Sequence, residues 1–231
     1  MTVIVSPQYA YLVFAAIFGF IWLVFYVRCP ETRKTQLIIS LLAMLLGPII
    51  EILYFRDYWY PLGVYPIGKW PYRLLVEDLL FSFSFTGMVG MLSRVFGKEA
   101  FVLELRGKKR YLLWLGALSI IISLPLIWLG LNSIWATSLG FLAVAVKAAG
   151  RKEEAIIYSV LCGFLTAAGM MLVFEAGYHI VTNSQALLES MWLLYGKPYW
   201  GARLLDTPLD WLAWGLCFGT MAGAVRHRLF T

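Results

Sequence analysis

Five acidic residues lie within apolar stretches long enough to cross a membrane, and they are the residues best suited to carry chemistry. They are Glu51, Glu77, Asp78, Glu175 and Asp210. A charged side chain inside a bilayer costs about 2.5–3.5 kcal/mol on insertion scales, so intramembrane acids usually serve a function. In an apolar pocket, desolvation disfavours the charged carboxylate, and the neutral acid that results can protonate a weak base such as an alkene. The acids therefore indicate proton transfer to an apolar substrate.

Aromatic side chains on the same stretches are suited to the cation that such a protonation would form. The faces of aromatic rings attract positive charge, so rings around a cavity can stabilise a carbocation. The candidates for substrate contact are Phe81, Phe85, Phe174, Trp211 and Trp214. Each ring taken singly is also explained by ordinary packing in a core or against lipid.

The composition predicts that the acids and the aromatic rings lie on membrane-spanning helices. Of 231 residues, 61% are hydrophobic and 14% are charged, whereas soluble domains have roughly 45–50% apolar and about 25% charged residues. A spanning helix needs about 20 largely apolar residues. Seven stretches fit this description: 9–27, 36–55, 73–95, 111–129, 132–146, 155–180 and 208–225. We expect a single all-α transmembrane domain over residues 1–231, with seven transmembrane helices.

The basic residues predict the orientation of these helices. With seven spans, alternate loops share a side, and 14 of the 19 lysines and arginines then fall on the same side. Cytoplasmic loops are enriched in Lys and Arg, so we expect the N-terminus outside the cell and the C-terminus in the cytoplasm. We expect the membrane to be a prokaryotic cell membrane. The formal net charge of +6 then belongs to these loops, and we expect no nucleic-acid partner. The sequence does not indicate an oligomeric state.

An internal repeat links the third and seventh stretches. The aligned pairs are Glu77 with Asp210, Phe85 with Phe218, Met88 with Met221 and Gly90 with Gly223. Glu51 and Glu175 each lie near the outer end of the preceding stretch. The pattern predicts two parallel three-helix repeats, 1–97 and 131–231, joined by a connector helix over 111–130. This symmetry would bring the acids of both halves around one cavity.

Two long loops on the predicted outer side are rich in Trp, Tyr and Pro, around residues 57–61 and 197–200. Such residues form the interfacial aromatic belt of many membrane proteins. The same loops would also suit a lid over a site that opens outward. The sequence leaves both interpretations open.

Metal and cofactor chemistry find little support in the sequence. Glu175 and His179 form an i, i+4 pair, but two ligands make a poor metal site. No phosphate-binding loop and no dinucleotide fingerprint is present. We therefore expect no metal and no cofactor.

The chain resembles the membrane lycopene cyclase family at short motifs around the acids. That family has a Pro-Trp-Asp-Asn-like motif at the end of one helix and a Pro-x-Glu-Glu motif, followed by phenylalanines, at the start of the next. The counterparts here are Pro48-Ile49-Ile50-Glu51, Glu77-Asp78-Leu79-Leu80-Phe81, Phe174-Glu175 and Pro208-Leu209-Asp210-Trp211. The first half lacks the proline of the second motif, and the second half lacks its paired acid. The resemblance covers most of the chain in topology but only short pieces in motif.

The resemblance implies cofactor-independent cyclisation of an isoprenoid or carotenoid, as in membrane-bound terpene cyclases of meroterpenoid pathways. Glu77 and Asp210 would be the leading acids. Asp78, Glu51 and Glu175 would position them or take back the proton. The hydrophobic isoprenoid substrate would enter from the membrane lipid between helices.

Two other functions fit the same residues. The first is a membrane binding or transport protein with an outward-facing acidic cavity, and the second is a structural protein with no site. The shape of the cavity distinguishes the first from an isoprenoid cyclase. A long, dry, aromatic tunnel open to lipid favours cyclisation, while a wet funnel open to the outside favours ion or solute binding.

Overall fold

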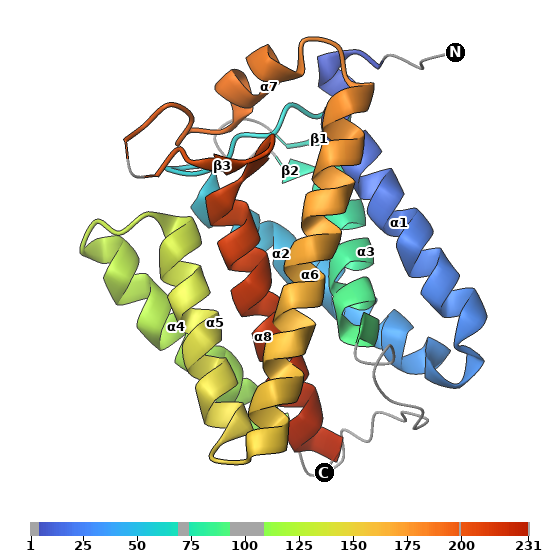
Figure 1. The fold of residues 1–231 in the computed structure, drawn as a ribbon, viewed down its shortest axis with the longest axis vertical. Helices are drawn as coiled ribbons and strands as arrows, with labels where there is room; N and C mark the ends of the chain where they lie inside the picture. The colour runs from blue at the N-terminus through green and yellow to red at the C-terminus, as the bar shows by residue number, and fades with distance from the viewer. Residues whose placement is uncertain (1–4, 69–73, 93–108, 199, 231) are drawn as a thin grey trace.

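The computed structural model describes residues 5–68, 74–92, 109–198 and 200–230, and the chain is mostly helical (Figure 1). The helices are α1 (Ala10–Arg28), α2 (Arg33–Tyr54), α3 (Val76–Leu92), α4 (Lys109–Trp128), α5 (Ser133–Ala149), α6 (Glu153–Ile180), α7 (Ser184–Met191) and α8 (Leu209–Phe230). Short 3-10 turns, Pro7–Tyr9 and Pro30–Thr32, precede α1 and α2. The prediction of an all-α protein is confirmed.

Each apolar stretch predicted from the sequence corresponds to one long helix. Four of these helices, α1, α2, α4 and α6, are long and apolar enough to cross a membrane, and α5 is a shorter apolar helix. Several boundaries differ from the prediction by three residues or more: α2 begins at Arg33, α3 begins at Val76 after a short strand, α5 continues to Ala149 and α8 to Phe230. The short helix α7 was not predicted, since its eight residues are too few for a clear periodic pattern. Residues 73 and 93–95 of the predicted third stretch lie outside the described residues.

The outward faces of the helices are apolar. Trp128, Leu113 and Leu172 are 87%, 74% and 71% exposed. Large contiguous apolar surfaces are rare on soluble monomers and mark contact with a membrane or a partner. Together with the four long apolar helices, this surface indicates a membrane protein.

The long helices form two groups of three, each with a central helix. Helix α3 packs against both α1 and α2, while α8 packs against both α5 and α6. Helix α4 packs on α5, at the side of the bundle (Figure 1). The N-terminus and the C-terminus lie at opposite ends of the molecule (Figure 1).

The aromatic loops fold into a cap over the end of the bundle that carries α7. The Leu193 N–H donates to the Tyr58 carbonyl at 2.9 Å, and the Tyr60 N–H donates to the Met191 carbonyl at 2.7 Å. Trp192 is only 1% exposed, and it pairs with Trp59 through an isolated β-bridge. The loop after α2 and the segment after α7 therefore pack on each other.

Two antiparallel hairpins lie beneath this cap, each directly before a central helix. Strands β1 (Pro66–Ile67) and β2 (Leu74–Leu75) precede α3. Strands β3 (Arg203–Leu204) and β4 (Thr207–Pro208) precede α8. The acids at the start of α3 and α8 thus follow equivalent hairpins.

Candidate functional site

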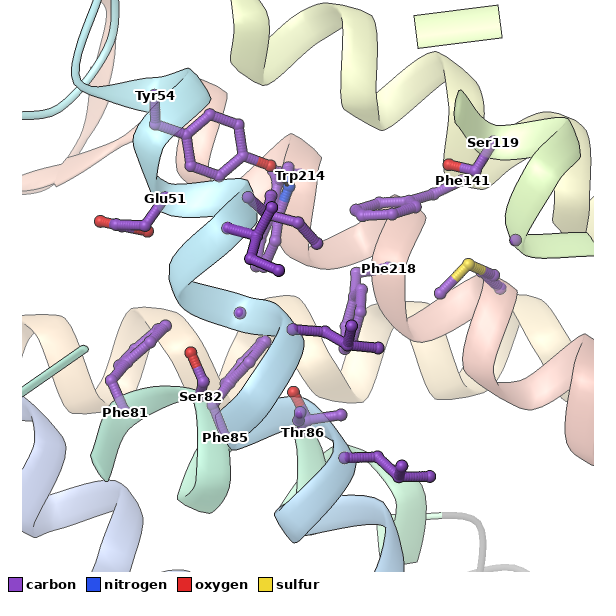
Figure 2. A pocket seen from close by; sticks show the side chains of 18 of the residues that line it. Glu51, Tyr54, Phe81, Ser82, Phe85, Thr86, Ser119, Phe141, Trp214 and Phe218 are labelled. Atoms are coloured by element: carbon purple, nitrogen blue, oxygen red, sulfur yellow. Dashed lines mark hydrogen bonds between the residues drawn. The ribbon is translucent and has the colours of Figure 1, made fainter. Parts of the chain in front are cut away.

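An apolar cavity of about 640 Å³ lies among α1, α2, α3, α4, α5 and α8. Ligand pockets usually measure roughly 300–1,000 Å³ and combine an apolar lining with a few polar groups. Figure 2 shows several of its side chains: Glu51, Tyr54, Phe81, Ser82, Phe85, Thr86, Ser119, Phe141, Trp214 and Phe218. The lining has the composition of a site for a hydrophobic molecule.

Glu51 is the one acidic residue that lines this cavity among the described residues. It lies one turn before the end of α2, and its carboxyl group forms no hydrogen bond or ion pair with any residue that the structure describes. The other carboxyl group that influences it electrostatically is that of Asp78. An acid in an apolar cavity without a basic partner is costly to ionise. Glu51 is thus the acid placed to meet a molecule bound in this cavity.

A series of aromatic rings in mutual contact lines the cavity that Glu51 also lines (Figure 2). Phe81 stacks on Phe85 with ring centroids 5.3 Å apart, and Phe85 stacks on Trp214 at 5.7 Å. Trp214 stacks on Phe218 at 5.3 Å, and Phe141 meets Phe218 edge-on at 5.3 Å. All five rings line the cavity, so a cation formed inside it would face aromatic surfaces.

Three tyrosines complete the polar side of the cavity. The Tyr54 hydroxyl lies 2.9 Å from Thr137 Oγ1 and accepts a hydrogen bond from the Trp214 indole N–H at 2.9 Å. The Tyr11 hydroxyl lies within electrostatic range of Glu51, Asp78 and Glu77. Two hydrogen bonds to the second half of the chain therefore fix the ring of Tyr54, while Tyr11 reaches toward the acids of the first half.

Tyr58 connects the cavity to the second half of the chain. It is 4% exposed, lines the cavity, and its hydroxyl interacts with Asp210 and more weakly with Glu51. Burial, with the Asp210 charge as the next cause, raises the pKa of Tyr58 well above its usual range. The hydroxyl of Tyr58 therefore keeps its proton at any physiological pH.

Glu77 and Asp78 are buried but hold backbone groups instead of lining the cavity. Glu77 Oε1 accepts hydrogen bonds from the N–H groups of Val64, at 2.7 Å, and Tyr65, at 3.3 Å. Asp78 Oδ2 accepts one from the Leu75 N–H at 2.6 Å. The second oxygens of both acids are buried without a hydrogen-bond partner among the described residues. These acids fix the first hairpin to the start of α3.

Asp210 has the equivalent place at the start of α8. It is 1% exposed, and its Oδ2 accepts a hydrogen bond from the Trp192 indole N–H at 3.0 Å. Its Oδ1 accepts one from the Trp211 N–H at 2.7 Å. Asp210 therefore ties the segment after α7 to α8.

Glu175 lies apart from the cavity, in a polar cluster at the end of α6. Its Oε1 accepts hydrogen bonds from the Asp206 N–H, at 3.1 Å, and from the Thr207 hydroxyl. His179 Nε2 lies 3.8 Å from Glu175 Oε2 and 3.9 Å from Asp206 Oδ2, and Arg203 lies 3.9 Å from Asp206. Glu175, His179 and Asp206 can present three ligand atoms within 4.8 Å of one another, but their hydrogen bonds and ion pairs already explain the geometry.

The structure thus separates the candidate residues into groups. Glu51, Phe81, Phe85, Trp211 and Trp214 line one cavity. Glu77, Asp78, Asp210 and Glu175 each accept hydrogen bonds from loop or hairpin groups instead. Phe174 is buried and stacks on Phe14 at 5.3 Å without lining the cavity.

Sequence reasoning missed the tyrosines and one structural acid. Tyr54 and Tyr58 lie in an aromatic-rich segment that offers no periodic signal separating lining residues from belt residues. Asp57 accepts hydrogen bonds from the N–H and the hydroxyl of Ser133. It therefore joins the loop after α2 to the start of α5, a contact that only tertiary structure reveals.

No protein-family model, curated protein or solved structure matches the chain.

Proposed function

We propose that the chain is a cofactor-independent isoprenoid cyclase in which Glu51 is the proton donor. The observation that carries this proposal is the cavity itself, which is lined by one carboxyl group without a basic partner and by a series of packed aromatic rings. Of the acids that the sequence predicted as catalytic, Glu51 takes the leading role. Glu77, Asp78, Asp210 and Glu175 position the hairpins and the cap around it.

The proposed reaction is an isomerisation. Glu51 transfers its carboxyl proton to one carbon of a C=C bond near the end of the chain, and the neighbouring carbon becomes a tertiary cation. A second C=C bond donates its electron pair to that cation and closes a ring. A carbon beside the new cation then loses a proton to the Glu51 carboxylate, which restores the acid. The rings of Phe81, Phe85 and Trp214 stabilise the positive charge during these steps.

The cap favours this function over an outward-facing transport site. Trp192 and the segment around it are packed over the outer end, and no described residue of α7 lines the cavity. A solute from outside would have to displace this packing. A lipid-soluble substrate needs no such opening.

We also infer seven spans in two parallel repeats, with the N-terminus outside. In each half, contacts recur between equivalent positions of the second and central helices. In the first half, residues of α2 face residues of α3 in the pairs Gly47–Ser82, Ser40–Gly87 and Ile39–Gly90. In the second half, the corresponding pairs between α6 and α8 are Met170–Gly215, Gly163–Thr220 and Cys162–Gly223. In this register Glu77 matches Asp210, whereas Glu51 matches Phe174.

A reporter tests the proposed orientation. A reporter that works only in the cytoplasm should be active when it is fused to the C-terminus, and an inactive reporter there would contradict the orientation.

The substitution Glu51→Gln tests the proposed reaction. It keeps the size of the side chain but removes the acid, so product formation from linear isoprenoids should fall by roughly 10²–10⁴-fold. Glu189→Gln is the matched control, because Glu189 is exposed on α7 and does not line the cavity. Product analysis of purified protein in lipid discs measures both. Unchanged conversion by Glu51→Gln would contradict the proposal.

A further inference from the structure

The shape of the cavity indicates the shape of the substrate, which the residue types of the lining do not. The lining residues on α8 run from Trp211 to Val225, about 21 Å at roughly 1.5 Å per residue, whereas a sphere of 640 Å³ would be only about 11 Å across. The cavity is therefore elongated along the helices. Glu51 lies at one end of it, near the cap, and Leu112 and Val225 lie toward the other.

One long side of the cavity faces the surroundings of the protein. Helices α2 and α4 are not closely packed on each other. Leu46, Ile49 and Ile120 line the cavity and are also 56%, 62% and 58% exposed. The opening between α2 and α4 is bordered by apolar side chains, as expected for access from lipid.

A glycine, Gly116, lies on the wall one helical turn from Leu112, in the part of the cavity away from Glu51. The lining residues of α4 follow helical spacing, which places Leu112, Leu115, Gly116, Ser119 and Ile120 on one face. A Cβ atom added at Gly116 would meet no atom within 4 Å. Glycine in a helix interior costs about 1 kcal/mol relative to alanine, so a glycine here leaves space in the cavity at the expense of helix stability.

We propose that the cavity holds a single linear isoprenoid chain that enters between α2 and α4, with its terminal double bond at Glu51, and that Gly116 sets the longest chain accepted. This inference rests on the proposed function and adds substrate geometry to it. The chain lies along α8 toward the C-terminal end of that helix. A larger side chain at Gly116 would fill this end of the cavity and leave the end near Glu51 open.

Binding of linear prenyl alcohols of increasing length tests this proposal. The proteins are the full chain, its Gly116→Phe variant and a Gly169→Phe control. Gly169 lies in α6, has the same open space around it and does not line the cavity. Binding is followed by native mass spectrometry and by quenching of tryptophan fluorescence, since Trp59, Trp211 and Trp214 line the cavity.

Gly116→Phe should weaken binding of the longest alcohols at least tenfold and leave the shortest ones unchanged, while Gly169→Phe should bind all lengths as the parent does. Equal weakening at every length, or no effect at any length, would overturn the proposal. Bound phospholipid that prenyl alcohols never displace would overturn it as well. This experiment measures binding, whereas Glu51→Gln tests the proposed reaction through product formation. A failure of the chain-length proposal can therefore be distinguished from a failure of the proposed reaction.

Discussion

At the scale of single residues, the difference between a reactive acid and a structural one lies in its partners. Glu51 lines the cavity without a partner among the described residues, whereas Asp210 accepts hydrogen bonds from Trp192 and Trp211. The sequence predicted that both would lie buried at the outer ends of helices. It could not tell them apart, because the hydrogen bond from Trp192 depends on how the segment after α7 folds back.

A structural role and a proton-donor role make opposite predictions for substitutions of Asp210. Asp210→Asn keeps an acceptor for the Trp192 indole N–H and should retain most activity. Asp210→Ala leaves that buried N–H without a partner, which costs about 1–3 kcal/mol of stability. Thermal unfolding in detergent should therefore separate the alanine variant from both the parent and the asparagine variant. A stable Asp210→Asn protein that has lost all conversion would instead make Asp210 a proton donor.

At the scale of helices, glycines set how closely α2 approaches α3. A Cβ atom at Gly47 would collide with the side chain of Ser82. In the second half the small residue is on the central helix, where Gly215 faces Met170 of α6. The sequence predicted the helices. The glycine lies on α2 at the α2–α3 interface but on α8 at the α6–α8 interface. The sequence could not predict this exchange, because the repeat does not show how each helix is rotated about its own axis.

A paired exchange tests this packing. Gly47→Ser alone inserts atoms into a filled contact and should cost about 1–3 kcal/mol of stability. Adding Ser82→Gly removes the colliding side chain and should restore most of that loss. A double-mutant cycle on thermal unfolding measures the coupling between the two positions. Additive effects of the two substitutions would show that α2 and α3 do not meet at these residues.

At the scale of the whole molecule, the bundle combines one closed end with an open side. The cap formed by the aromatic loops, an alternative that the sequence left undecided, packs over the end near Glu51. The side between α2 and α4 is apolar and exposed. Composition and hydropathy predicted a helical membrane protein and the places of its long helices. The cavity arises from the gap between α2 and α4, and no local pattern in the sequence records such a gap.

Covalent labelling with two carbodiimides tests most directly whether Glu51 is an uncharged acid reachable from the lipid. Both reagents add to protonated carboxyl groups, but one is hydrophobic and the other dissolves only in water. With protein in lipid discs and peptide mass spectrometry as the readout, the hydrophobic reagent should modify Glu51, and a linear prenyl alcohol should protect it. The water-soluble reagent should leave Glu51 unmodified. Modification of Glu51 from water alone, or no reaction with the hydrophobic reagent, would contradict a proton donor in a lipid-accessible cavity.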